Sequence, residues 1–147
     1  MGIVPLDHGQ ITILGHSSTS SELKRNRIGF MPQEMSLVGE LTVKETIFFF
    51  GNIFEMPQVK LNELYKMLHE LLELPGDSQR VDECSGGEMR RISMAASMIH
   101  EPDLLILDEP TVGLDSLLRE KIWNFLMTET KVRNLTIIIT THYINEA

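Results

Sequence analysis

Two long apolar segments in the second half of the chain constrain the fold more than any other feature of the sequence. "DLLILDEP" (103–110) and "NLTIIITTH" (134–142) carry apolar residues at successive positions, and "DSLLREKIWNFLMTET" (115–130) between them has helical periodicity. Apolar runs without alternation are typical of strands that are buried on both faces of a parallel sheet. The order strand, helix, strand therefore predicts an α/β fold with these strands adjacent and parallel, and with Asp108 and His142 at one edge of the sheet.

Shorter patterns in the first third of the chain predict two more strands and a capped helix. The stretches "GQITIL" (9–14) and "RIGFMP" (27–32) have the composition of short strands, and the residues between them are polar, as in a loop. Thr42 is followed three positions later by Glu45, which fits the T-x-x-E capping box. We therefore expect a helix over 43–54.

Further helices are predicted from apolar spacing and from helix-starting residues. One covers "LNELYKMLHELLEL" (61–74) and ends at Pro75 and Gly76, another covers "GEMRRISMAASMIH" (87–100), and Asp115 is the expected N-cap of the helix that follows it. The apolar positions are Leu61, Leu64, Leu68, Leu71 and Leu72 in the first helix, and Met89, Ile92, Ala96 and Ile99 on one face of the second.

Composition restricts the class of protein. The chain has 147 residues, of which 42% are hydrophobic and 23% charged, enough for one domain with a core. Its net charge of −8 argues against nucleic acid as a partner, although a local phosphate site remains compatible with it. The single cysteine, Cys84, favours a reducing compartment, and neither a membrane-spanning run nor a signal peptide is visible.

The stretch "SGGE" (85–88) supports two interpretations. Ser85 as N-cap with Glu88 at the third helical position forms an ordinary capping box. Gly86 and Gly87 are not what a first helical turn needs, since glycine destabilises a helix by about 0.5–1 kcal/mol relative to alanine. They favour close approach of the backbone to a ligand, and the N–H groups at a helix N-terminus form an anion site.

Polar residues also stand where the predicted strands end, the place at which open α/β sheets bind ligands. Asp108 could hold Mg²⁺, and Glu109 could orient an attacking water. His142 and Gln33 each follow a strand, and Asp115 lies in the "GLD" turn. Taken alone, strand-end acids most simply cap the next turn, and a histidine such as His142 most simply lies on the surface.

Together, the order and spacing of these features resemble the nucleotide-binding domain of ABC ATPases, from about Gly9 to His142. Gln33 matches the Q-loop, "CSGGE" the signature sequence usually written LSGGQ, "LLILDE" Walker B, "GLD" the D-loop, and His142 the switch histidine. Two positions depart from the pattern, since Cys84 replaces the usual leucine and Glu88 the usual glutamine.

The resemblance implies an ATPase that uses ATP and Mg²⁺ and in which two such domains pair head to tail. Ser85, Gly86 and Gly87 would bind the γ-phosphate of ATP held by the second domain, with Glu88 and Asp115 counted among the nucleotide-binding residues. Asp108 would coordinate Mg²⁺, Glu109 would act on the hydrolytic water, His142 would contact the γ-phosphate, and Gln33 would sense Mg²⁺ and water. Gln33 would also relay this state to the transmembrane domain of a transporter at the cytoplasmic face of a membrane.

The phosphate loop, G-x-x-x-x-G-K-[ST], does not occur in the sequence. In the family this loop precedes a helix and a turn that "IVPLDHGQI" (3–11) matches, so the chain is interpreted as a fragment of a longer protein, cut at both ends. We expect a partial P-loop NTPase-type parallel sheet without the phosphate-loop strand and helix, which leaves an apolar edge at "LTIIIT". Residues 1–36 and 99–147 would form the core, and 37–98 an inserted helical subdomain with the signature.

Three functions remain open at this level. The first is the ATPase module of an exporter, with most resemblance to H- or G-type half-transporters or ABC-2-type exporters. The second is a soluble ABC ATPase that acts on ribosomes or DNA. The distance from Gln33 to Ser85 (85 − 33 = 52 positions) is too short for the coiled-coil insert of the chromosome-maintenance ATPases. The third is a non-catalytic fragment of a broken gene.

Overall fold

The computed structural model describes residues 7–18, 20, 25–34 and 36–141. In chain order the elements are β1 (Thr12–Ile13), β2 (His16–Ser17), a 3-10 turn at Arg25–Arg27, β3 (Ile28–Met31), α1 (Val43–Ile53), α2 (Gln58–Leu71), a second 3-10 turn at Val81–Glu83, α3 (Gly86–Met98), β4 (Leu104–Asp108), α4 (Ser116–Val132) and β5 (Thr136–Thr140). Among these residues, none of the helices combines the length and the apolar character needed to span a bilayer.

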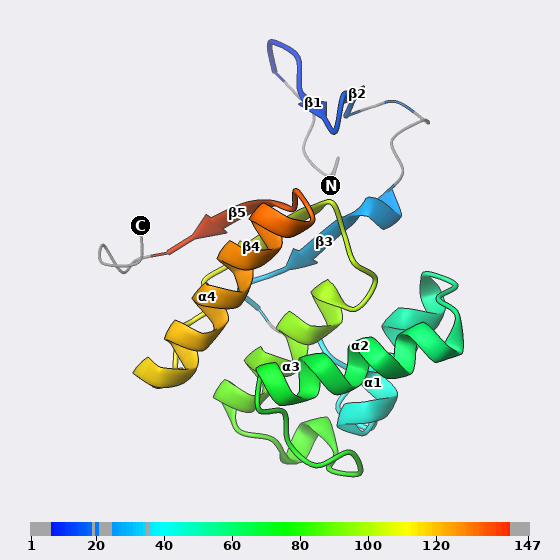
Figure 1. Ribbon diagram of the computed structural model, residues 1–147, viewed down its shortest axis with the longest axis vertical. Helices are drawn as coiled ribbons and strands as arrows, with labels where there is room; N and C mark the ends of the chain where they lie inside the picture. The colour runs from blue at the N-terminus through cyan, green and yellow to red at the C-terminus, as the bar shows by residue number, and fades with distance from the viewer. Residues whose placement is uncertain (1–6, 19, 21–24, 35, 142–147) are drawn as a thin grey trace.

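A three-stranded parallel sheet, β3-β4-β5, organises the molecule (Figure 1). β4 lies in the centre, with Leu104 opposite Ile28 of β3 and opposite Thr136 of β5. The register continues to Asp108, which lies opposite Thr140. The prediction that the two apolar segments form adjacent parallel strands is therefore confirmed. Because the three strands run in one direction, their C-terminal ends meet at one edge of the sheet.

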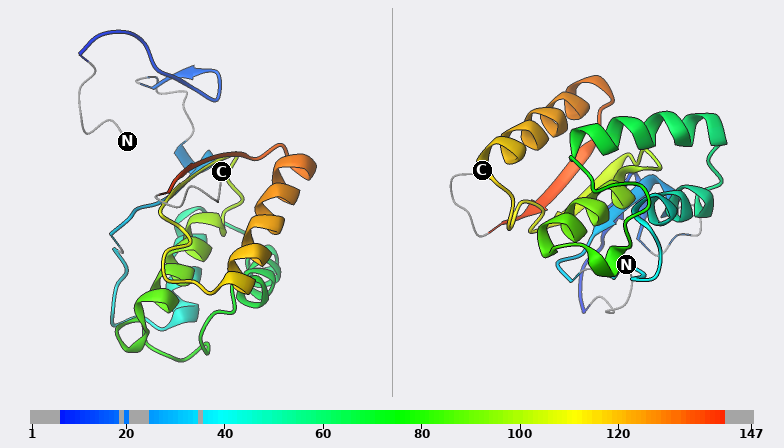
Figure 2. Two further views of the ribbon diagram at one scale, coloured as in Figure 1. Left: turned by 90° about the vertical axis from the view of Figure 1, so that its left-hand side faces the viewer. Right: turned by 90° about the horizontal axis from the view of Figure 1, so that it is seen from below.

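The helices cover one face of this sheet. The left view of Figure 2 shows the helices below the sheet. Met31, Leu107 and Ile139 are opposite one another in the register and belong to the same hydrophobic core as residues of α3 and α4, so they lie on the covered face. On the other face, the side chains of Phe30 and Ile138 are 54% and 50% exposed. The prediction of burial on both faces is wrong for β5, whose residues alternate between exposed and half-buried. The reason is that α3 and α4 pack on the same side of the sheet.

Helix α3 contacts the sheet, through β3 and β4, and also contacts α1. All seven residues from Ile92 to Met98 are buried. At Gly29 of β3, an added Cβ would lie 2.3 Å from the carbonyl oxygen of Ser97, so only glycine permits this approach. The single apolar face expected for this helix is therefore part of a wider buried surface, because the helix contacts both the sheet and α1.

Helix α1 begins as the T-x-x-E pattern predicts. The hydroxyl of Thr42 accepts a hydrogen bond from the amide of Glu45 at 3.2 Å, and the Glu45 carboxylate accepts one from the Thr42 amide at 2.9 Å. Farther along α1, a Cβ at Gly51 would lie 2.4 Å from Cδ1 of Leu61, so glycine allows α1 and α2 to pack closely. Helix α2 begins three residues earlier than expected, at Gln58.

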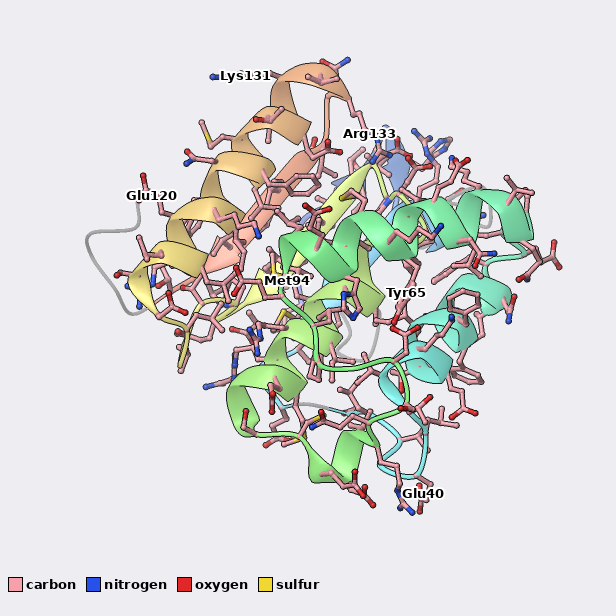
Figure 3. The ribbon with its side chains drawn as sticks, turned by 60° about the horizontal axis from the view of Figure 1, so that its bottom comes forward. Glu40, Tyr65, Met94, Glu120, Lys131 and Arg133 are labelled. Atoms are coloured by element: carbon pink, nitrogen blue, oxygen red, sulfur yellow. The ribbon has the colours of Figure 1, made fainter. Side chains whose placement is uncertain are left out.

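The segment after α2 is held by a polar network around Asp77. Its carboxylate accepts hydrogen bonds from the hydroxyl of Tyr65 at 2.7 Å and from the ammonium of Lys44 at 3.2 Å (Tyr65 is labelled in Figure 3). The Tyr65 hydrogen bond, followed by Lys44, lowers the pKa of Asp77. Burial and the same carboxylate raise the pKa of Tyr65. The network joins α1, α2 and the loop that leads to α3.

The predicted strand over 9–14 is shorter than expected and lies outside the main sheet. β1 pairs antiparallel with β2, with Thr12 opposite Ser17 and Ile13 opposite His16. The turn between them places Leu14 at φ 49° and Gly15 at φ 81°, two successive positive φ values of the kind that two-residue hairpins use. The hairpin stands apart from the helices and from β3-β4-β5 in Figure 1 and in the left view of Figure 2.

Candidate functional site

The C-terminal edge of the parallel sheet brings together the predicted site positions Gln33, Asp108 and Glu109, the last directly after Asp108. Gln33 follows β3, Asp108 ends β4, and β5 ends beside Asp108 at Thr140. The hydroxyl of Thr140 donates a hydrogen bond to the carboxylate of Asp108. His142 lies outside the described residues, so its position at this edge stays a prediction; β5 runs toward that edge.

Glu109 occupies a strained position directly after β4. Its φ of 53° lies in the left-handed region, which non-glycine residues rarely adopt without help from their surroundings. The Glu109 amide donates to the carbonyl oxygen of Thr140 at 3.0 Å, and the side chain is only 6% exposed. A carboxylate placed in this way at a strand end is suited to orienting a water molecule.

The "SGGE" stretch forms the predicted capping box at the start of α3. The hydroxyl of Ser85 accepts from the amide of Glu88 at 3.3 Å, and the Glu88 carboxylate accepts from the amide and hydroxyl of Ser85 at 2.7 and 2.8 Å. The Ser85 hydrogen bonds lower the pKa of Glu88. Gly86 and Gly87 form the first turn, whose N–H groups have no partner within a helix. The capping interpretation is confirmed, while an anion-binding role for this turn stays a prediction.

The two glycines have different surroundings. A Cβ added at Gly86 would meet nothing within 4 Å, and Gly86 is exposed. A Cβ at Gly87 would lie 3.3 Å from the carbonyl oxygen of Gly113, in the "GLD" turn. The sequence predicted that the backbone here approaches a ligand closely. At Gly87 the backbone instead approaches another part of the same chain, whereas Gly86 leaves space for a ligand.

Asp115 is the N-cap of α4, as predicted. Its carboxylate accepts hydrogen bonds from the amides of Leu117 and Leu118, both at 3.0 Å. The hydrogen bond from Leu118 is the largest cause of a lowered pKa at Asp115, and the positive charge of Arg91 contributes. The carboxylate thus has a structural role, and its assignment as a nucleotide-binding residue stays a prediction.

Arg90 contacts the site, and the sequence interpretation did not include it. Its guanidinium donates to the carbonyl oxygen of Glu109 at 2.5 Å and to that of Gln33 at 3.4 Å. It thereby connects α3 with the residues after β4 and after β3. The available signal was its helical spacing: Ser93 and Ser97, three and seven positions later, line one groove together with Ile28 and Phe30 of β3.

The side chains at this edge could hold a magnesium ion only if phosphate oxygens supplied part of its ligands. Among the described residues there is no group of three or more His, Cys, Asp or Glu side chains that could hold a metal. Asp108, with the hydroxyl of Thr140 beside it, supplies one carboxylate. Mg²⁺ is commonly bound by one or two carboxylates together with water and the phosphate oxygens of a substrate, which matches this donor set.

Comparisons with known proteins agree with this arrangement. The family model described as "ABC transporter" matches residues 1–112. The chain is 43% identical to ABC transporter G family member 23 of Dictyostelium discoideum, over 99% of this chain and 21% of that protein. It is 41% identical to the Nod factor export ATP-binding protein I of Rhizobium sp. (strain N33), over 100% of this chain and 49% of that protein. The chain thus spans about half or less of the length of these curated relatives.

Solved structures show the same fold. A dimeric structure of a bacterial ABC transporter cassette superimposes with a TM-score of 0.83 at 25% identity, covering 96% of this chain and 66% of that one. A dimeric post-hydrolysis state of the same cassette, bound to ADP and phosphate, gives a TM-score of 0.82 at the same identity and coverage. The α/β fold class is confirmed, and so is the resemblance drawn from the sequence motifs. With a family model that matches 112 of its 147 residues, the chain belongs to the ABC transporter family.

Proposed function

We propose that this chain is part of the ATP-binding and ATP-hydrolysing module of an ABC transporter that drives transport across a membrane. The observation that carries the proposal is the meeting of Gln33, Asp108 and Glu109 at one edge of the parallel sheet, with Glu109 in a strained and buried conformation. The relatives named as transporters and as an export ATP-binding protein support the same function. The acidic chain and these relatives do not favour action on ribosomes or DNA.

The proposed roles divide between two nucleotide sites. Asp108 would hold Mg²⁺, which supplies positive charge to the phosphates when it is bound. Glu109 would orient the attacking water, Gln33 would contact water and the metal, and His142 would contact the γ-phosphate. The first turn of α3 would serve a different nucleotide site. In a head-to-tail pair of domains, the site of the second domain would include Ser85, Gly86, Gly87, Glu88 and Asp115. The dimeric state of the similar cassette supports this pairing.

A groove lined in part by Pro32, the residue before Gln33, is the proposed contact for the transmembrane domain. It encloses about 310 Å³ and is lined by apolar side chains from β3, α1 and the segment after β3, among them Phe30, Leu37, Phe50 and Phe54. We assign residues 1–36 and 99–147 to the core and 37–98 to a helical subdomain, so the groove lies where the two meet. Binding of the transmembrane domain in the groove would then affect Gln33. We place this contact at the cytoplasmic face of the membrane.

We further propose that the chain functions within a longer protein. The phosphate loop that holds ATP in this family is not in the 147-residue sequence, and the chain spans 21% and 49% of two relatives. The 147-residue chain alone is therefore expected to show no measurable ATP turnover. Turnover by the purified chain that disappears in Glu109→Gln would contradict this expectation.

The test of the function uses the complete transporter that contains this chain. Glu109→Gln keeps the size and shape of the side chain but replaces the basic carboxylate with a neutral amide, so ATP turnover should fall about 100-fold or more while ATP still binds. Glu120→Gln, on the exposed side of α4 (Figure 3), is the matched control and should hydrolyse ATP normally. Wild-type turnover in Glu109→Gln would refute the proposed role.

A further inference from the structure

The guanidinium of Arg90 holds two backbone carbonyl groups that belong to different parts of the site. One hydrogen bond goes to the carbonyl oxygen of Glu109, 2.5 Å away, and the other to that of Gln33, 3.4 Å away. The two carbonyls are far apart in the sequence, after β4 and after β3 respectively. Arginine can serve both because its N–H groups form a rigid planar fork, which lysine lacks.

The contact with Glu109 bears on a residue that needs support. A φ of 53° costs a non-glycine residue on the order of 1–3 kcal/mol and persists only where neighbours determine it. The amide of Glu109 is fixed by the carbonyl of Thr140, and its carbonyl is fixed by Arg90. The backbone of Glu109 is thus held on both sides of its Cα atom, which sets the direction of its carboxylate.

We propose that Arg90 is a positioning residue for hydrolysis, which fixes Glu109 in its strained conformation and keeps the Gln33 backbone in register with it. Arg90 also lies five residues after Ser85 on α3, so it ties the orientation of the signature helix to the two carbonyls. This inference rests on the proposed function, because it acts through the water-orienting role of Glu109. If Arg90 only joined α3 to the sheet, its loss would affect stability and leave the chemistry of folded molecules unchanged.

The experiment measures kcat and KM for ATP in the complete transporter. Arg90→Met should lower kcat by about 10- to 100-fold with KM changed less than about threefold, because small displacements of a catalytic group cost about this much. Arg90→Lys keeps the charge but can serve one carbonyl well, so its kcat should be intermediate. Arg133→Met is the matched control. Arg133, labelled in Figure 3, also donates to a distant carbonyl, that of Glu101 at 3.3 Å, and it is the C-cap of α4, whose N-cap is Asp115.

Two further readouts separate positioning from stability. Amide hydrogen exchange over 106–114 should be faster in Arg90→Met, because the Glu109 backbone has lost a constraint. In a Glu109→Gln background, Arg90→Met should reduce the residual kcat by less than about twofold, since the two residues act as a unit. If Arg90→Met unfolds, the same cycle is measured with Arg90→Lys.

The outcomes distinguish the inference from the function. Full loss of activity in Glu109→Gln with normal kcat in Arg90→Met and Arg90→Lys would overturn the positioning role alone. Additive losses in the double variant would also overturn it, because Arg90 would then not act through Glu109. Wild-type turnover in Glu109→Gln would instead refute the proposed function.

Discussion

His100 is an ionisable residue in a largely apolar setting. Its ring stacks on Phe54 with 3.9 Å between centroids, and its Nε2 lies 3.3 Å from the carbonyl oxygen of Ile28. Its Nδ1 is buried and has no hydrogen-bond partner among the described residues. Desolvation by burial lowers the pKa of His100, against the opposing effect of the Ile28 carbonyl. The folded state therefore favours the neutral form of His100 over the protonated form.

This arrangement predicts a loss of stability on acidification. Since the pKa is lower in the folded than in the unfolded chain, the unfolded state takes up a proton first, and stability falls as the pH drops below about 6.5, the value of a free histidine. Urea unfolding between pH 7.5 and pH 5 should show a smaller decrease for His100→Gln than for the wild type. His8→Gln, at an exposed position, is the control and should retain the wild-type decrease; equal slopes for His100→Gln and wild type would contradict the prediction.

Gly86 allows a second test at the level of a single residue, in the complete transporter. A side chain fits there, since a Cβ meets nothing within 4 Å, and an acid is compatible with a first helical turn. In Gly86→Asp, the new carboxylate would lie close to the γ-phosphate of ATP. Two unit charges about 4 Å apart repel each other by roughly 4 kcal/mol at an effective dielectric constant of 20. We expect a folded protein that binds ATP but neither dimerises with ATP nor hydrolyses it.

The uncharged variant Gly86→Ala controls for size and should dimerise more readily than Gly86→Asp. ATP-dependent dimerisation by light scattering and ATP turnover measure both effects. If the first turn of α3 serves only as a helix cap, Gly86→Asp will behave as wild type, because Ser85 and Glu88 still form the capping box.

At the scale of elements, the start of α1 depends on a local signal whose strength can be measured. Thr42 caps the helix through its hydroxyl, and its backbone also accepts a hydrogen bond from the hydroxyl of Thr46 at 2.9 Å. Thr42→Ala removes the side-chain cap and should lower the free energy of unfolding by about 1 kcal/mol. Thr42→Ser, which retains a hydroxyl, should restore most of it. A chemical denaturation midpoint unchanged by Thr42→Ala would show that the cap contributes nothing.

Such local signals explain which elements could be predicted from the sequence. Thr42, Ser85 and Asp115 cap α1, α3 and α4 as predicted, because a cap involves only the next three residues. The direction of β4 and β5 also followed from their apolar composition. Asp108 was predicted at one edge of the sheet with His142 for the same reason, since parallel strands end together, and Gln33 was predicted at the end of another strand.

Other features depend on contacts between distant segments and could not be predicted in this way. The exposure of Ile138 on β5 depends on which face of the sheet α3 and α4 pack against. The contact of Gly87 with the Gly113 carbonyl, and that of Arg90 with Glu109, join residues that no local pattern relates. β1 and β2 are two residues each, with Leu14 in a left-handed conformation that its side chain does not suggest.

At the scale of the whole molecule, the uncovered face of the sheet predicts self-association of the 147-residue chain. Phe30, Ile106 and Ile138 lie opposite one another across the three strands on that face, and β5 is an edge strand in the described part of the chain. Apolar side chains on an open edge favour association with other chains. Ile138→Lys should shift sedimentation of the chain toward the monomer.

Val59→Lys provides the control for this effect. Val59 is also exposed, but it lies on α2 and not on the sheet. Val59→Lys adds the same charge as Ile138→Lys and should leave the degree of association of the chain nearly unchanged. A monomeric wild-type chain at concentrations near 100 µM, on the order at which exposed apolar surface causes aggregation, would contradict the prediction.

The order of the strands has a consequence for how the chain acquires its structure over time. β3 pairs with β4 across 76 positions (104 − 28 = 76), and β4 pairs with β5 across 32 (136 − 104 = 32). Helix caps form within a few residues, whereas the sheet must close long loops before its hydrogen bonds repay the lost entropy. During synthesis β4 emerges before β5, so the central strand can pair with β3 while its other edge waits for the ribosome to add α4 and β5. We therefore expect α1 to α3 to form the first organised part of the growing chain, and the strand ends around Asp108 to come together last.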